Sequence, residues 1–256
     1  MRGKLIDALA LPTLPLLWFQ GRRVVRKMPR LSPAGGPPHG LVDGHGAPLR
    51  VLAFGESTAV GVGVDTLDQA VVGRFAHALH KRSGRAVAWE AAGLSGATVR
   101  DGHLNVLPEL AHGPRDIVLL LFGANDTLAR RSAQDYAGDL AELIAALRER
   151  AGGAPILLSS VPPLHTFPAL PRPLSTYLGA RARWLDDAAA NLALPGVHYA
   201  PVNIRMEPAL FAHDGYHPSP VGYRIWGEIL ADAAVRHGLV AVPGQAPGAQ
   251  SQQVTE

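Results

Sequence analysis

The sequence predicts an α/β protein with a parallel sheet that is covered by helices on both faces. Short apolar segments alternate along the chain with longer amphipathic segments. The apolar segments are solidly hydrophobic, as expected of strands buried on both faces of a parallel sheet. A chain of 256 residues, 47% of them hydrophobic, is long enough for one such domain with additions.

Each element follows from its local pattern. The expected strands are LRVLAF, AVAWEAA, DIVLLLF, PILLSSV and GVHYAPV, in that order. The expected helices lie between them and at the end, at 69–82, 97–111, 133–151, 174–194 and 220–237. Ser132 followed by Asp135 predicts a helix N-cap with an acid in the first turn. The body of the protein is therefore expected at residues 49–238.

The first thirty residues form a separate basic segment. They hold seven basic residues against one acid, a formal charge of +6, whereas the whole chain carries +3. Residues 31–256 therefore sum to about −3, which argues against nucleic-acid binding through a broad positive face. The apolar run at 8–19 contains Pro12 and Pro15, precedes a basic cluster and is too short to span a bilayer. We expect no cleavable signal peptide and a cytoplasmic protein, with membrane association left open.

Residues 14–30 predict an amphipathic helix. One stripe holds mainly apolar residues, and the opposite face is basic: Leu14, Leu17, Trp18, Gly21, Val24, Val25 and Met28 against Gln20, Arg22, Arg23, Arg26 and Lys27. Such a helix either contacts a membrane surface peripherally or packs on the body of the protein. Residues 31–48, rich in proline and glycine, predict a linker, and residues 239–256 predict a flexible tail.

Candidate reactive residues follow the predicted strands. Ser57 comes directly after the first strand, in GES, and its position alone would fit a turn or a helix cap. His217 is the candidate base for a serine nucleophile, and Asp214 can orient its imidazole. Suitable donors to an oxyanion are the N–H groups of Ser57 and Gly93 and the side-chain amide of Asn125. The carboxyl ends of parallel strands share one edge, so these groups are expected together.

The order GES, Gly93, GAND at 123–126 and DGYH at 214–217 resembles the SGNH hydrolases, also called the GDSL esterase/lipase family. The resemblance covers about residues 49–238. It implies a flavodoxin-like three-layer α/β/α sandwich with about five parallel strands. It also implies a serine hydrolase that needs neither metal nor cofactor, with Ser57, Asp214 and His217 catalytic and Ser57, Gly93 and Asn125 as oxyanion hole. Because all these residues begin at Ser57, we expect removal of residues 1–47 to leave turnover of a soluble ester nearly unchanged.

Several alternatives accompany this interpretation. The first block has Glu56 where the family commonly has aspartate, and we expect this longer acid to face away from the chemistry. GLSGA at 93–97 approximates the elbow of a different hydrolase class, with Ser95 as nucleophile, but lacks its last glycine. His213 and His217 flank a loop and do not predict a metal site. Asp126 is expected to cap the helix that follows GAND.

The loop at 162–174 is long and apolar, and it predicts a substrate pocket that includes Leu164, His165 and Phe167. Its composition favours a carboxylic ester with a short or medium acyl chain or an aryl group, or a lipid ester. An acyltransferase, a carbohydrate deacetylase and a non-catalytic lipid- or glycan-binding module remain alternatives.

Overall fold

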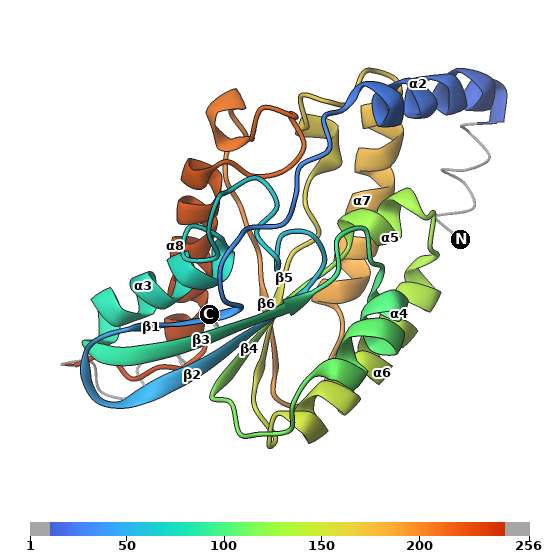
Figure 1. The fold of residues 1–256 in the computed structure, drawn as a ribbon. Coiled ribbons are helices and arrows are strands. Elements are labelled where there is room, and N and C mark those ends of the chain that lie inside the picture. Colours follow the sequence, from blue (N-terminus) through green and yellow to red (C-terminus); the bar gives the residue numbers. More distant parts are fainter. Residues whose placement is uncertain (1–10, 244–256) are drawn as a thin grey trace, which may run out of the picture.

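The computed structural model describes residues 11–243, in which a six-stranded sheet lies between two layers of helices (Figure 1). The strand order is β1-β3-β2-β4-β5-β6, and only β1 is antiparallel to its neighbour. The strands are β1 (His39–Val42), β2 (His45–Gly55), β3 (Arg85–Gly93), β4 (Ile117–Leu121), β5 (Ile156–Ser159) and β6 (Val197–Ala200). The five strands expected from the sequence are thus present as β2 to β6. The predicted fold class is confirmed.

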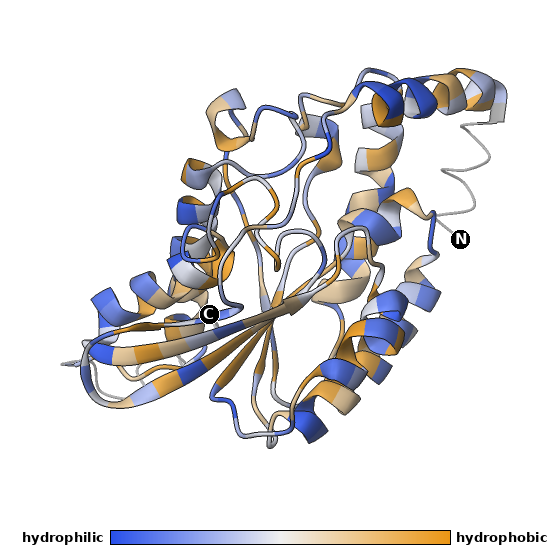
Figure 2. Cartoon of the chain, in the orientation of Figure 1, coloured by the Kyte–Doolittle hydropathy of each residue, from blue (hydrophilic) through white to orange (hydrophobic). Residues whose placement is uncertain are grey.

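The helices cover the sheet in two groups, with their apolar sides toward the strands (Figure 2). Helices α4, α6 and α7 contribute to the core on one face, and α3 and α8 to the core on the other. The helices are α2 (Leu14–Lys27), α3 (Val71–Ser83), α4 (Val99–Asp101), α5 (Ala124–Leu128), α6 (Ala133–Arg150), α7 (Leu174–Ala190) and α8 (Pro220–Arg236). Short helical turns are η1 (Leu11–Thr13), η2 (Gly102–Val106), η3 (Leu107–Glu109), η4 (Leu164–Thr166) and η5 (Pro208–Leu210).

The segment 31–48, expected as a linker, is part of the sheet. Residues 39–42 form β1, which pairs with residues 87–90 of β3, and β2 already begins at His45. β1 is an edge strand with alternating exposed and half-buried residues, so it needs ladder hydrogen bonds but few apolar side chains. Its composition therefore resembles that of a loop. The expectation of a linker is wrong for residues 39–48.

The helix expected at 97–111 is broken into three short pieces. Only α4 is α-helical; it continues into the π-helical turn η2 and the 3-10 turn η3. Gly102 lies against the ring of Phe122, where a Cβ atom would clash with the ring, and Pro108 cannot donate to a helical ladder. Close packing on the sheet thus sets the path of this segment.

Helix α2 forms where the sequence predicts it but buries a narrower stripe. Leu17 belongs to the core, and Leu14 and Val24 pack beside it. Trp18 and Val25, expected on the same stripe, are exposed. Figure 1 shows α2 lying across the end of the molecule above α7. The packed stripe is therefore a contact with the body of the protein, which was the second alternative that the sequence left open for this helix.

The structure describes only part of the two chain ends for which the sequence made predictions. Residues 1–10 and 244–256 lie outside the described residues, and so does most of the tail predicted at 239–256. Val240, at the start of that tail, is buried in the core beside α3 and α8. Within residues 11–243, no helix has the length and apolar character that crossing a membrane requires.

Candidate active site

Ser57 lies two residues beyond the end of β2, in a run of turns. The Glu56 N–H still donates to the carbonyl of Leu121 in β4, 3.1 Å away, and the turns begin at Ser57. The next helix, α3, begins only at Val71. Ser57 is therefore not a helix cap, and its hydroxyl is available for another role.

The Ser57 hydroxyl, the His217 imidazole and the Asp214 carboxylate form a continuous hydrogen-bonded chain. Ser57 Oγ lies 3.2 Å from His217 Nε2, and His217 Nδ1 lies 2.6 Å from Asp214 Oδ2. A carboxylate can only accept, so the imidazole carries its proton on Nδ1 and leaves Nε2 as the acceptor of the serine proton. The structure thus brings together all three residues that the sequence places in the catalytic unit.

Asp214 is held in its ionised form. Its side chain is fully buried, which opposes ionisation, but the bonds from the His217 ring and from the backbone N–H groups of Tyr216 and His217 outweigh burial. The net result is a pKa below the usual value for an aspartate. A carboxylate that stays ionised can stabilise a positive imidazolium.

Asn125 is bound to Glu56, contrary to the expectation that Glu56 faces away from the chemistry. The Asn125 side-chain amide donates to Glu56 Oε2 at 2.5 Å, and the Asn125 backbone N–H donates to the same oxygen at 3.1 Å. The Ala124 N–H donates to Oε1 at 3.3 Å. A side-chain amide has two N–H bonds, so one remains after the bond to Glu56.

Glu56 occupies this position because its longer side chain reaches beneath the start of α5. It is 4% exposed, and burial raises its pKa to about 8, although the three N–H donors favour the ionised form. The Glu56 carboxyl group accepts these three bonds and fixes the first residues of α5 against the nucleophile loop. Glu56 is thus a site residue that the sequence interpretation set aside.

Gly93 ends β3 directly beside the nucleophile loop. A Cβ atom on this residue would lie 2.6 Å from the carbonyl oxygen of Gly55 and 3.1 Å from the Ala59 side chain. Only glycine allows this approach of the two backbones. The first and second blocks of the predicted site are therefore adjacent. By contrast, Ser95 is exposed on the following loop.

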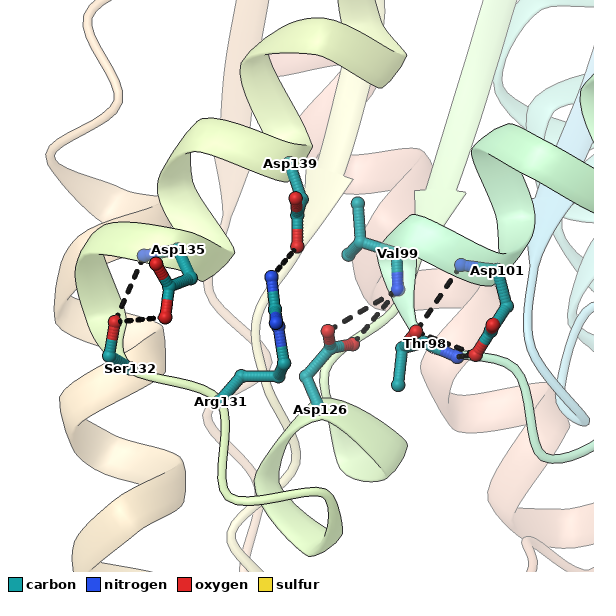
Figure 3. Close-up of polar contacts among 8 residues, drawn as sticks. All are labelled: Thr98, Val99, Asp101, Asp126, Arg131, Ser132, Asp135 and Asp139. Carbon is teal, nitrogen blue, oxygen red and sulfur yellow. Dashed lines mark hydrogen bonds and ion pairs between the residues drawn. The ribbon is translucent and has the colours of Figure 1, made fainter.

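A second layer of polar contacts holds the GAND segment in place (Figure 3). The Asp126 carboxylate accepts from the Val99 N–H at 3.2 and 3.3 Å, so it caps α4. The sequence had led us to expect that it caps the helix after GAND, and this expectation is wrong. Burial raises the pKa of Asp126 to about 7. Nearby, Ser132 accepts from the Asp135 N–H at 3.1 Å, which confirms the predicted N-cap. Asp126 thus ties the GAND segment to α4, which follows the loop after Gly93.

An apolar cleft opens beside Ser57 and His217. The empty space along it amounts to about 830 Å³, its open mouth included. Of the three predicted substrate-binding residues, only Phe167 lines this cleft. Leu164 is fully buried in the core, and His165 lines a neighbouring cavity instead. The expectation is therefore wrong for Leu164, which the short turn η4 directs inward.

Much of the cleft comes from segments that the sequence interpretation missed. These are the stretch after β6, the loop before His217 and the inner face of α8, which contribute Val202, Ile204, Met206, Leu210, Phe211, Tyr216 and Trp226. Apolar residues at every second position of VNIRM were the available signal. The Tyr216 hydroxyl is buried in this region and has no hydrogen-bond partner among the described residues.

Comparison with known proteins decides the family. The sequence model of the GDSL-like Lipase/Acylhydrolase family matches residues 53–225, about two thirds of the chain. The chain belongs to this family. The region that matches the GDSL family contains all five predicted catalytic and oxyanion-hole residues, whereas α2 and β1 precede it.

Individual relatives are distant. The GDSL-like esterase Rv1075c of Mycobacterium tuberculosis is 27% identical over 192 residues, which are 71% of this chain and 60% of that protein. The aryl esterase of M. smegmatis has a TM-score of 0.54 at 24% identity, covering 75% of this chain and 99% of that one. A family 3 carbohydrate esterase of Clostridium thermocellum has a TM-score of 0.57 at 18% identity, covering 76% and 100%. These two structures support the fold of the GDSL chain.

Proposed function

We propose that this chain hydrolyses carboxylic esters through an acyl-enzyme on Ser57, with the acyl group in the apolar cleft. The observation that carries the proposal is the chain from Ser57 Oγ through His217 to Asp214, at 3.2 and 2.6 Å, which opens onto that cleft. Membership of a lipase and acylhydrolase family supports ester cleavage in general.

The proposed reaction has two similar halves. His217 Nε2 takes the hydroxyl proton of Ser57 while Oγ bonds to the ester carbonyl carbon, and Asp214 stabilises the imidazolium. The imidazolium then gives that proton to the leaving alcohol as the carbon–oxygen bond breaks. Water repeats the sequence on the acyl-enzyme, releasing the carboxylic acid and restoring Ser57. Each half forms one carbon–oxygen bond at the carbonyl carbon and breaks one, and His217 is neutral again after each half.

The charge that develops on the carbonyl oxygen requires donors. The second N–H of the Asn125 amide is one, because the bond to Glu56 fixes the amide and leaves this hydrogen unused. The N–H groups of Ser57 and Gly93 are the others, on two backbones that lie in close contact. Donors that are fixed before the reaction need no reorganisation when the oxyanion forms, which favours the transition state over the ground state.

The apolar lining of the cleft favours an extended acyl chain over a bare acetyl group. Its walls are mostly aliphatic and aromatic side chains from α8, β4 and the segment after β6. Burial of each methylene contributes about 0.8 kcal/mol, so a chain of several carbons gains more here than acetate does. Relatives named aryl esterase and carbohydrate esterase leave a second possibility, an acetyl sugar ester, which this lining does not favour.

Two assays test the proposal together. A fluorophosphonate probe should label the wild type and Ser95→Ala but not Ser57→Ala, and Ser57→Ala should lower kcat by roughly 10⁴-fold or more. Across p-nitrophenyl esters from acetate to palmitate, kcat/KM should rise from acetate to medium chains. Labelling of Ser57→Ala but not of Ser95→Ala would overturn the nucleophile, and preference for acetyl sugars would overturn the acyl-chain assignment.

A further inference from the structure

The outward face of α2 combines exposed apolar side chains with cations. The exposed fractions are 47% for Leu16, 63% for Trp18, 56% for Phe19 and 72% for Val25. These four are among the few large hydrophobic side chains that the described residues leave exposed. The side chains that α2 uses for its own packing are different ones, such as Leu17 and Val24. The exposed group is therefore not part of the core.

The same face is positively charged. Arg22, Arg23, Arg26 and Lys27 lie on α2 and Arg30 follows it closely, and no acid occurs between residue 14 and Asp43. The Arg22 guanidinium lies 4.8 Å from the centre of the Trp18 ring, which places an aromatic ring and a cation side by side at the surface. The remainder of the chain has a slightly negative formal charge, so this cluster is a local feature.

Two hydrogen bonds attach helix α2 to the end of the loop at 162–174. The Gln20 side chain donates to the Arg172 carbonyl at 2.8 Å and accepts from the Leu174 N–H at 3.1 Å. Residues 172 and 174 end the loop whose Phe167 lines the cleft. Figure 1 shows α2 at the end of the molecule beyond α7 and α5. Helix α2 is therefore bonded to the end of a loop that lines the cleft.

We propose that the outward face of α2 binds the surface of an anionic lipid bilayer. Aromatic and aliphatic side chains would enter the headgroup region, and the basic residues would pair with lipid phosphates. This combination suits lipid better than nucleic acid, which would not require exposed Leu16 and Val25. Lipid binding would bring the cleft close to esters in the membrane, and this second consequence rests on the proposed function.

The proposal differs from what the sequence pattern suggested. There, the stripe that includes Leu17 and Val24 was the candidate membrane face, and those residues are packed on the protein. The proposed contact uses the exposed part of the helix, which carries Trp18 and Val25 from that stripe together with Phe19 and the basic residues. Membrane contact and packing on the body are thus compatible, each using its own face of α2.

Vesicle binding by the full chain tests the proposal. The chain should sediment with vesicles of phosphatidylcholine and phosphatidylglycerol, and much less with phosphatidylcholine alone. Each basic residue near an anionic surface raises partitioning about fivefold, so Arg23→Glu with Arg26→Glu should lower it at least ~25-fold. Trp18→Ala with Phe19→Ala should weaken binding at all salt concentrations. The matched control reverses Lys81 and Arg236, two exposed cations at the ends of α3 and α8.

The outcomes separate lipid from other occupants. Wild type and Ser57→Ala should bind vesicles equally, so a failure of the hydrolase proposal leaves this result intact. Turnover of a soluble ester by the α2 variants reports whether they fold. Equal loss in the Lys81 and Arg236 control, tighter binding to duplex DNA than to anionic vesicles, or a dimer that disappears in Trp18→Ala with Phe19→Ala would each overturn the proposal.

Discussion

The buried acid Glu56 should make this protein less stable as the pH rises. Burial raises the pKa of Glu56 from 4.5 to about 8 in the folded chain, whereas an unfolded glutamate titrates near its ordinary value. The folded state therefore keeps a proton that the unfolded state has already lost. This contribution to stability is fully present below about pH 4.5 and is lost as the pH rises through about 8.

The magnitude follows from the interval between the two pKa values. At 1.36 kcal/mol per pH unit, the whole interval corresponds to roughly 5 kcal/mol. About 3 kcal/mol of it falls between about pH 5.5 and about pH 8.5, which for a domain of this size lowers Tm by roughly 6–12 °C. Burial raises the pKa of Asp126 to about 7, so Asp126 adds a loss of the same sign.

The measurement compares Glu56→Gln with the wild type by urea unfolding at the two pH values. The substitution keeps the size of the side chain but removes its titration. We expect the fall in unfolding free energy to be smaller in Glu56→Gln by about 3 kcal/mol, whatever its stability at either pH. Glu142→Gln, an exposed substitution on α6, should retain the wild-type fall. A full fall in Glu56→Gln, or a wild type that gains stability with pH, would refute the reasoning.

Two further predictions concern the oxyanion donors and the amino-terminal segment. Asn125→Ala should lower kcat by roughly 10²–10³-fold with little change in KM, measured on a soluble ester, because its free N–H bonds the oxyanion more strongly than the ground-state carbonyl; a change mainly in KM would assign it to substrate binding. Deletion of residues 1–47 should lower Tm and turnover, contrary to the expectation from sequence. It removes β1, the buried Leu17 and the bonds from residues 34 and 35 to Val60 and Asp65 in the nucleophile loop, at 3.0 and 2.9 Å. Wild-type turnover in the deleted chain would show that this segment does not support the loop.

The sequence alone determined the sheet and the positions of the candidate reactive residues. Solid apolar runs and helical periodicity are local properties of the chain, and they predicted β2 to β6 and most of the helices. Because parallel strands end at one edge, the order of the blocks was enough to expect Ser57, Asn125 and His217 together. The spacing of Asp214 and His217 within one short loop likewise made their contact predictable.

The tertiary structure decided which partner each of the remaining groups meets. Glu56 and Asp126 both occur in short polar motifs, yet one accepts the bonds of Asn125 and the other caps α4, 27 residues before it in the chain. The edge strand β1 and the buried side of α2 depend on neighbours that only the folded sheet supplies. Local patterns specify which side chains seek burial or a hydrogen bond, but the partner is chosen by three-dimensional packing, because contacts between distant segments form only once the layers have closed on one another.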